Sequence, residues 1–352
     1  MALLLPLCLG PELAAQTWTG QGTGQNVNRW SGGNARTNWS PQTVPNAIGA
    51  AVQFTNADAG LSGRTIDLNN AITIGSLNIS NTTGASFTIL GGGGNTLTFN
   101  NSGSASLTLT GNSNPDLSGA SIIVAAGNTF NVNHSGTGTL RMGAINAGAN
   151  TVTFNNSSTG TTQLNGAITG TGTVVKSGSG SATLSGTIAT GGLDIQGGTL
   201  LLAASNRISD STNLTLSGGT LALGGHSDNL GTLTLNANSV IDFGGGDSVL
   251  RFADSSAVAW NPNATLTILN WNGKDAGAGG GGADQILFGS NISGLTAAQR
   301  SQIVFVNYAS SNIHLPSGEV VPIPESATVY AGLGLLAFAL FHGFRRLRRT
   351  KS

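Results

Sequence analysis

The chain has 352 residues and a formal net charge of zero, and only 8% of its residues are charged. Ordinary soluble domains carry about 25% charged residues. This chain is nevertheless 39% hydrophobic and contains 54 glycines, so its polarity comes from uncharged side chains. Residues 16–325 contain 13 acidic and 9 basic residues, and 9 − 13 gives −4. This balance offers no basic face, so nucleic acid is excluded as a partner.

The first 15 residues are typical of a secretory signal. An apolar stretch, Ala2–Leu9, precedes the small residues Ala14 and Ala15, which match the hydrophobic and cleavage regions of such a signal. We predict cleavage after Ala15, so that Gln16 begins the mature protein. The basic residues that normally open a signal are missing, and we expect the true start codon upstream. Cys8 is the only cysteine and would be lost, which excludes disulfides and cysteine-based sites.

Tryptophans gather near the two ends of the chain and predict capping segments there. Large amphipathic rings suit the covering of an exposed end of a stack of strands. The alternative is a carbohydrate-binding platform, which also uses aromatic rings but holds them on the surface. The residues concerned are Trp18, Trp30, Trp39, Trp260 and Trp271.

Residues 61–255 repeat short runs of alternating apolar and polar residues, bounded by Gly, Asn, Ser or Asp. Period-two alternation with β-branched residues predicts short strands, and no part of this region has a helical period. The predicted strands are Thr65–Leu68, Ile72–Ile79, Ser86–Leu90, Thr96–Phe99, Ser106–Leu109, Ser121–Val124, Thr129–Val132, Thr151–Phe154, Thr173–Val175, Leu193–Ile195, Thr199–Leu202, Asn213–Leu216, Thr220–Leu223, Thr232–Leu235, Val240–Phe243 and Val249–Phe252.

Strands at this spacing allow a sandwich, a barrel or a solenoid, and the repetition favours the solenoid. The triplet Gly-Thr-Leu begins at Gly198, Gly219 and Gly231. With roughly 20 residues per coil, this region would form about ten coils. Stacked at about 4.8 Å, they would make a rod near 50 Å long. We therefore expect an all-β fold in which each coil buries its apolar side chains against the coils above and below.

One segment, 173–203, carries a more specific pattern. A Lys-x-Gly-x-Gly start leads to Leu-Ser-Gly, then Gly-Gly and a final Gly-Thr-Leu. The residues are Lys176, Gly178, Gly180, Leu184, Ser185, Gly186, Gly191, Gly192, Gly198, Thr199 and Leu200. This pattern resembles the autotransporter-associated beta strand repeat, which implies a right-handed parallel β-helix. The secretion route of autotransporters is not implied, because it needs a C-terminal membrane barrel of many ~10-residue strands.

The sequence contains few residues that could serve in catalysis or metal binding. Glycoside hydrolysis needs two carboxylates roughly 5–10 Å apart, and the nearest arrangement is Asp242 and Asp247 around Phe-Gly-Gly-Gly. Glycine-flanked aspartates usually form turns, and weak calcium binding is the alternative for this pair. We expect no enzyme and no cofactor. The alternative is a polysaccharide lyase or hydrolase on the same scaffold. The other candidates are isolated: Asp194, Asp210, Asp228, Asp254, Lys176, Lys274, His134, His226 and His314.

The C-terminal residues combine an apolar run with a basic end. Residues 327–344 form an 18-residue, mainly apolar run without any Asp, Glu, Lys or Arg, which covers about 27 Å as a helix, close to the ~30 Å hydrocarbon core of a bilayer. We predict a single transmembrane helix; a buried core helix is the alternative. The arginines that follow would hold the end on the cytoplasmic side. This membrane-stop cluster is Arg345, Arg346, Arg348 and Arg349.

Pro324 and Glu325 lie just before the apolar run. The combination of Pro-Glu motif, hydrophobic helix and arginine cluster resembles the PEP-CTERM sorting tail of Gram-negative bacteria. The resemblance implies that an exosortase-type membrane protease cuts near Pro324 and Glu325 and passes the protein to the cell surface. Ser326 stands where that family has a second proline, which leaves the efficiency of processing open.

The predicted organisation is a signal at 1–15, an N-terminal cap at 16–60, a solenoid at 61–255, a closing segment at 256–310 with a short helix at Leu295–Gln302, a tether with the sorting motif at 311–326, and a membrane helix with its basic end at 327–352. We expect an exported surface or extracellular-matrix protein, held transiently in the inner membrane. Its Thr-, Ser- and Asn-rich surface would adhere to extracellular polysaccharide.

Overall fold

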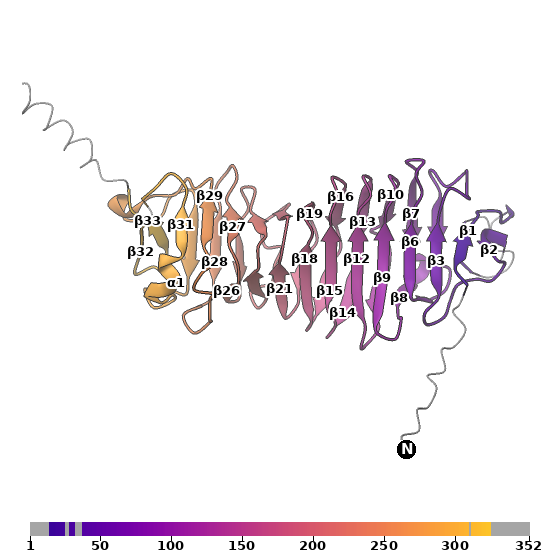
Figure 1. The fold of residues 1–352 in the computed structure, drawn as a ribbon, viewed down its shortest axis with the longest axis horizontal. Helices are drawn as coiled ribbons and strands as arrows, with labels where there is room; N and C mark the ends of the chain where they lie inside the picture. Colours follow the sequence, from indigo (N-terminus) through magenta and orange to yellow (C-terminus); the bar gives the residue numbers. More distant parts are fainter. Residues whose placement is uncertain (1–13, 25–27, 32–36, 310, 325–352) are drawn as a thin grey trace, which may run out of the picture.

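Short parallel strands wind into a three-sided rod in the computed structural model, which describes residues 14–24, 28–31, 37–309 and 311–324. Successive coils place their strands side by side, so that two walls of the rod are each one continuous sheet and the third is divided into two (Figure 1). Ten strands stack in parallel along one wall, which gives about ten turns. The prediction of a β-solenoid is therefore confirmed.

The first wall, sheet A, has eleven strands. In order along the rod they are β2 (Trp39–Ser40), β1 (Gln16–Trp18), β3 (Ala51–Phe54), β6 (Ser76–Ile79), β9 (Ser104–Leu109), β12 (Thr129–His134), β15 (Val152–Asn156), β18 (Thr173–Ser177), β21 (Gly192–Ile195), β23 (Asn213–Leu216) and β26 (Leu233–Leu235).

Sheet B also has eleven strands. They are β4 (Thr65–Asp67), β7 (Ser86–Leu90), β10 (Asn114–Leu117), β13 (Thr139–Met142), β16 (Thr161–Leu164), β19 (Ser181–Leu184), β22 (Thr199–Leu202), β24 (Thr220–Ala222), β27 (Ser239–Asp242), β29 (Leu266–Leu269) and β31 (Ile303–Phe305).

The third wall consists of two shorter sheets. Sheet C comprises β5 (Ile72–Ile74), β8 (Thr96–Phe99), β11 (Ser121–Val124), β14 (Ile145–Gly148), β17 (Ile168–Gly170) and β20 (Ile188–Ala189). Sheet D comprises β25 (Asp228–Leu230), β28 (Val249–Phe252) and β30 (Gln285–Phe288). Between these two sheets, the third wall is continued only by an isolated parallel β-bridge from Ile188 in β20 to Ile208, among the residues that the structure describes.

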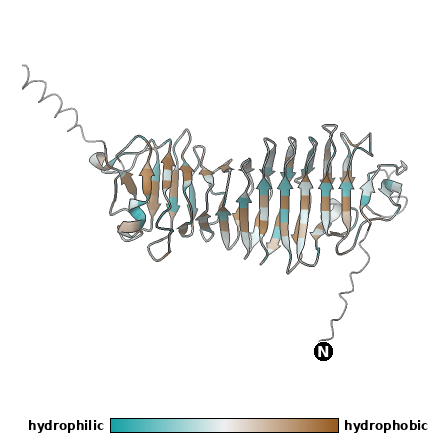
Figure 2. Ribbon diagram, viewed as in Figure 1, coloured by the Kyte–Doolittle hydropathy of each residue, from teal (hydrophilic) through white to brown (hydrophobic). Residues whose placement is uncertain are grey.

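The interior is filled by rows of apolar side chains held in register. On sheet A, for example, Val152, Val174 and Leu193 are successive partners, and each is at most 1% exposed. Alternate residues of each strand face the interior because side chains in a strand point to opposite sides. The strands of sheet A accordingly show alternating teal and brown residues in Figure 2. The burial of these rows is the main force that holds the coils together.

The coils vary in length along the rod, and the corners between the walls are tight. Ser76 pairs with Ser106, 30 residues later, whereas Leu214 pairs with Leu233, 19 residues later. One predicted run, Ile72–Ile79, is in fact two strands on different walls. Gly75 forms the corner between them, where a Cβ would lie 2.6 Å from the Cα of Gly49.

A column of glycines forms one such corner. A Cβ on Gly111 would collide with the carbonyl oxygen of Asn81, and a Cβ on Gly136 would collide with that of Gly111. The backbones of successive coils therefore touch directly at this corner. Any side chain there would push neighbouring coils apart.

Tryptophans close the first end of the rod, as predicted. The rings of Trp18 and Trp39 are 5.0 Å apart at 83°, and those of Trp30 and Trp39 are 4.8 Å apart. β2 pairs antiparallel with β1 and so covers the open edge of sheet A. An antiparallel strand at this position blocks further parallel stacking, which protects the rod from edge-to-edge association.

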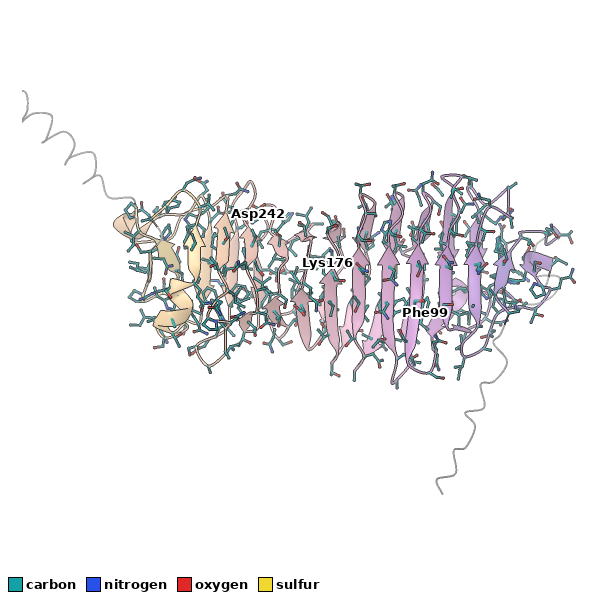
Figure 3. The ribbon with its side chains drawn as sticks, in the orientation of Figure 1. Phe99, Lys176 and Asp242 are labelled. Carbon is teal, nitrogen blue, oxygen red and sulfur yellow. The ribbon has the colours of Figure 1, made fainter. Side chains whose placement is uncertain are left out.

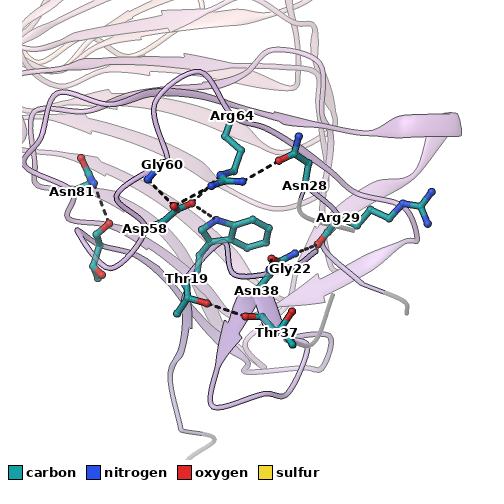
Figure 4. A network of polar contacts seen from close by, with 12 residues as sticks. Thr19, Gly22, Asn28, Arg29, Thr37, Asn38, Asp58, Gly60, Arg64 and Asn81 are labelled. Carbon is teal, nitrogen blue, oxygen red and sulfur yellow. Dashed lines mark hydrogen bonds and ion pairs between the residues drawn. The ribbon is translucent and has the colours of Figure 1, made fainter. Parts of the chain in front are cut away.

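Asp58 holds this cap together through polar contacts (Figure 4). Its carboxylate accepts a 3.0 Å hydrogen bond from the Trp18 indole and 2.9 Å from the Gly60 amide. Arg64 forms an ion pair with the same carboxylate at 2.9 Å and donates to Asn28. Asp58 is only 6% exposed, so a change at this position would remove a buried ion pair.

The other end is closed by aromatic packing and a hairpin. Trp271 packs edge-on against both Phe243 and Phe305. The antiparallel strands β32 (Asn312–His314) and β33 (Val320–Pro322) form the hairpin, and an antiparallel bridge from Glu319 to Leu287 covers the edge of sheet D. The expected short helix is present as α1 (Ala297–Ser301).

Several strands extend the solenoid beyond residues 61–255. β1 and β3 continue sheet A before residue 61, and β29, β30 and β31 continue sheets B and D after residue 255. In the part of the chain that the structure describes, no helix is long and apolar enough to cross a membrane. The predicted transmembrane segment, residues 327–344, lies outside the described residues.

Candidate functional site

The predicted processing positions lie next to the two ends of the folded rod. Ala15 immediately precedes β1, so cleavage after it would leave the first strand intact. Pro324 is exposed and follows β33 by two residues. Glu325 and the cluster Arg345, Arg346, Arg348 and Arg349 lie outside the described residues.

The outer side of sheet A carries a regular array of uncharged polar side chains, which we call the neutral face. One row runs Ser76, Ser106, Asn131, Thr153, and the second runs Asn78, Thr108, Asn133, Asn155. Each residue is the register partner of the next, and all eight are half-buried.

The geometry of the parallel sheet fixes the spacing of these groups. Neighbours along the rod are about 4.8 Å apart, and the two rows are separated by two residues, or about 6.6 Å. None of the strands β6, β9, β12 and β15 contains an Asp, Glu, Lys or Arg residue. The neutral face therefore presents hydroxyl and amide groups in a fixed lattice without any charge.

The tryptophans do not form a surface platform for carbohydrate, so that alternative is wrong. Trp18, Trp30 and Trp39 are at most 1% exposed, and Trp260 and Trp271 are 8% exposed. Their rings pack against other aromatic rings inside the two caps. A binding platform would instead need ring faces open to solvent.

Asp242 behaves as a turn residue. Its Oδ1 accepts hydrogen bonds from the Gly244 amide at 2.9 Å and from the Asn270 amide group at 2.6 Å. Asp247 is exposed on the far side of the glycine turn. Among the described residues, no three His, Cys, Asp or Glu side chains are grouped as they would be to hold a metal ion.

Lys176 lies inside the rod rather than on its surface, near the middle of its length (Figure 3). It occupies an inward row between Phe154 and Ile195, and its Nζ donates to the carbonyl oxygens of Ser177, Gly178 and Gly197. Burial lowers the pKa of Lys176 to about 8. The lysine that opens the repeat pattern thus fastens two successive turns of backbone.

A second polar group lies in the two coils that precede Lys176. Nδ1 of His134 is 2.9 Å from the hydroxyl of Thr162, which Asn156 also contacts at 3.3 Å. Asn156 further donates to the carbonyls of Gly160 and Ser181. Burial lowers the pKa of His134, so this imidazole is neutral at pH 7. Both buried groups serve the corner between sheets A and B.

Three buried acidic side chains accept hydrogen bonds from backbone amides along the third wall. Oδ2 of Asp228 accepts the backbone amides of Arg207 at 2.8 Å and Ile208 at 3.1 Å, where sheet C has ended and sheet D begins. Burial raises the pKa of Asp228 to about 6. Asp284 and Glu319 accept backbone amides in the same way, and burial raises the pKa of each.

The candidates from the sequence are thus mostly structural. Asp194 bonds to Gln196 and Ser217 on the surface, and His314 is buried in the closing hairpin. The sequence predicted a surface rich in Thr, Ser and Asn but not which residues form the neutral face, because successive members of each row are 22 to 30 positions apart. Comparisons with family models, curated proteins and solved structures gave no match for this chain.

Proposed function

We propose that the protein is exported, sorted by its C-terminal tail, and serves as a non-enzymatic adhesive rod in association with extracellular polysaccharide. The neutral face is the observation that carries this proposal. Polysaccharides present repeated hydroxyl groups, and side-chain hydroxyls and amides can both donate to and accept from them. Each hydrogen bond between a side chain and the polysaccharide replaces hydrogen bonds to water and contributes only about 1 kcal/mol net. Adhesion would therefore depend on many such contacts acting together.

The proposal includes a right-handed winding of the coils. Connections between parallel strands of one sheet are right-handed in about 98% of cases, because of the twist of the strands. It also includes a transmembrane helix at residues 327–344, stopped by the arginine cluster, and removal of this helix by an exosortase-type protease near Pro324 and Glu325. The exposed position of Pro324 supports access by such an enzyme.

Sorting is tested by mass spectrometry of the mature C-terminus after fractionation of the native host. We expect a terminus near Pro324 and Glu325 in the envelope or medium fraction. An intact Ser352 in the inner membrane would instead mean a permanent anchor. It would overturn the proposed release to the matrix.

Adhesion is tested by retention of the purified rod on the matrix polysaccharide of the producing organism. Thr153→Glu places a charge in the neutral face and should lower retention at least fivefold. Thr169→Glu is the matched control, because it makes the same change on β17, in the same coil but on sheet C. Equal retention of the two variants would contradict a role for the neutral face. Absence of retention of the unaltered rod would contradict the proposed function.

The alternative, a carbohydrate-active enzyme that uses Asp242 and Asp247, has less support. The Oδ1 contacts of Asp242 are those of a turn former. Release of reducing ends from the same polysaccharide, lost on Asp242→Asn and Asp247→Asn, would favour this alternative.

A further inference from the structure

A groove lies on the C-terminal third of the rod, away from the neutral face. It has a volume of about 490 Å³ and lies along β25 and β28, with the loop 289–294 as one bank. Ala253 supplies exposed apolar atoms, whereas the side chains of Leu230 and Phe252 are turned into the core. The main polar side chains are those of Asp210, Asn229, Arg251, Asp254 and Asn291. A concave site with an apolar part and a few convergent polar groups is the usual form of a small-ligand site.

Register brings the polar groups together. Asn229 and Arg251 are direct partners on adjacent strands, and both are exposed. Asp254 follows β28 by two residues, and Asp210 follows the bridge residue Ile208 by two. Residues that are 44 positions apart in the sequence therefore line one groove.

The charged groups of the groove are free to bind a ligand. Within the described residues, neither Asp210 nor Arg251 has a side-chain hydrogen bond or ion pair, and the three charged side chains form no ion pair with one another. Asp254 uses Oδ1 to accept from the amide and hydroxyl of Ser256 at 2.9 and 2.6 Å. Its Oδ2 accepts no hydrogen bond from any residue that the structure describes.

The set of groups matches adjacent hydroxyls better than it matches an ion. Carboxylates only accept hydrogen bonds, a guanidinium only donates, and the amides of Asn229 and Asn291 do both. An anionic ligand would meet two carboxylates and one guanidinium, an unfavourable balance. A metal ion lacks a cluster of ligands within the described residues. A neutral sugar can donate to the carboxylates, accept from Arg251 and place C–H groups against Ala253.

We propose that this groove is a second, specific binding site for a neutral saccharide segment of one to a few units. It deepens the proposed function, on which it rests: the neutral face gives weak extended contact, and the groove selects the polysaccharide. Binding without cleavage is expected. The hydrogen bonds from Ser256 lower the pKa of Asp254, whereas the general acid of a glycosidase needs a raised pKa.

Affinity electrophoresis of the folded rod tests the groove, in gels that contain dextran, arabinoxylan or alginate. We expect retardation by at least one neutral polysaccharide and weaker retardation by alginate. Arg251→Ala and Asp210→Ala should each weaken the neutral interaction at least fivefold. Asp247→Ala is the matched control, since it removes an exposed carboxylate outside the groove. Unchanged thermal melting would show that the variants remain folded.

The outcomes separate this proposal from the function on which it rests. Retardation that survives both groove variants, preference for alginate, or no retardation in any gel would each overturn the groove as a saccharide site. Retention on the native matrix is measured separately. A rod that is retained on the matrix equally well with and without Arg251 would leave the proposed adhesion intact and remove only the groove.

Discussion

Asp228 offers the sharpest test of how buried polar groups support the rod. The carboxylate is 1% exposed, and burial raises its pKa from 3.8 to about 6. Between these two values the folded state holds a proton that the unfolded state releases. The free energy of unfolding must therefore fall as pH rises from about 4 to about 6. A difference of about two pKa units corresponds to roughly 3 kcal/mol.

Asp228→Asn should remove this pH dependence. The amide oxygen can still accept from the backbone amides of Arg207 and Ile208, and no charge is buried at pH 7. The amide nitrogen would lie near the Asn229 amide, which offsets part of the gain, so we expect about 1–3 kcal/mol of stabilisation at pH 7.5. At pH 4 the variant and the unaltered protein should be equally stable.

Hydrogen exchange is the suitable assay, because a stack of coils can open locally without unfolding as a whole. The amides of Arg207 and Ile208 report on the site directly. They should exchange faster at pH 7.5 than at pH 4.5, after correction for intrinsic rates, and Asp228→Asn should slow them at pH 7.5. Asp247→Asn serves as the exposed control. The same corrected pH response in Asp228→Asn as in the unaltered protein would refute the reasoning.

Three further substitutions test the corner, the cap and the buried lysine. Gly111→Ala should destabilise the rod by about 3 kcal/mol or more in denaturant melts, because the backbones of neighbouring coils touch at this position. Gly245→Ala is the control and should not destabilise the rod, since open space surrounds that residue. Equal effects of the two substitutions would contradict the tight corner. Asp58→Ala should lower the free energy of unfolding by about 3–5 kcal/mol. It should also expose the Trp18 indole and shift the tryptophan fluorescence to longer wavelength. An unshifted spectrum would contradict the role of Asp58 in the cap. Because the pKa of Lys176 is lowered by burial, the free energy of unfolding of the unaltered rod should increase as pH rises from 8 to 10.5, by up to about 3 kcal/mol. Lys176→Met should abolish this increase. The same increase in the variant would show that Lys176 is not its cause.

The strands of sheet A were the easiest to predict. β6 and β23 alternate apolar and polar residues without interruption, and their inward positions are aliphatic. β12 and β15 follow the same alternation up to their last inward residues, His134 and Asn156. This local pattern depends only on which face of a strand is buried. The same alternating pattern would therefore be expected in any fold that buries one side of the strand.

Several strands of sheets B and C could not be found in the same way. β10 contains Pro115, which argues against a strand, yet this residue lies inward and in register with Phe87. β16 buries Thr162, whose hydroxyl is satisfied by His134 in the neighbouring coil. Such residues are tolerated in strands only because a neighbouring coil supplies their partners, and a single sequence does not show those partners.

A stack of short strands with aromatic ends follows from the sequence alone, since alternation, glycine corners and the placement of tryptophans are local features. Which side chains meet depends on the folded structure. Register between coils lines up the neutral face, turns Lys176 inward, and brings Arg251 beside Asn229 and the carboxylates of the groove. Strand pairing across coils joins residues 18 to 37 positions apart, and the varying length of each turn, set by how its corners pack, determines which residues become neighbours.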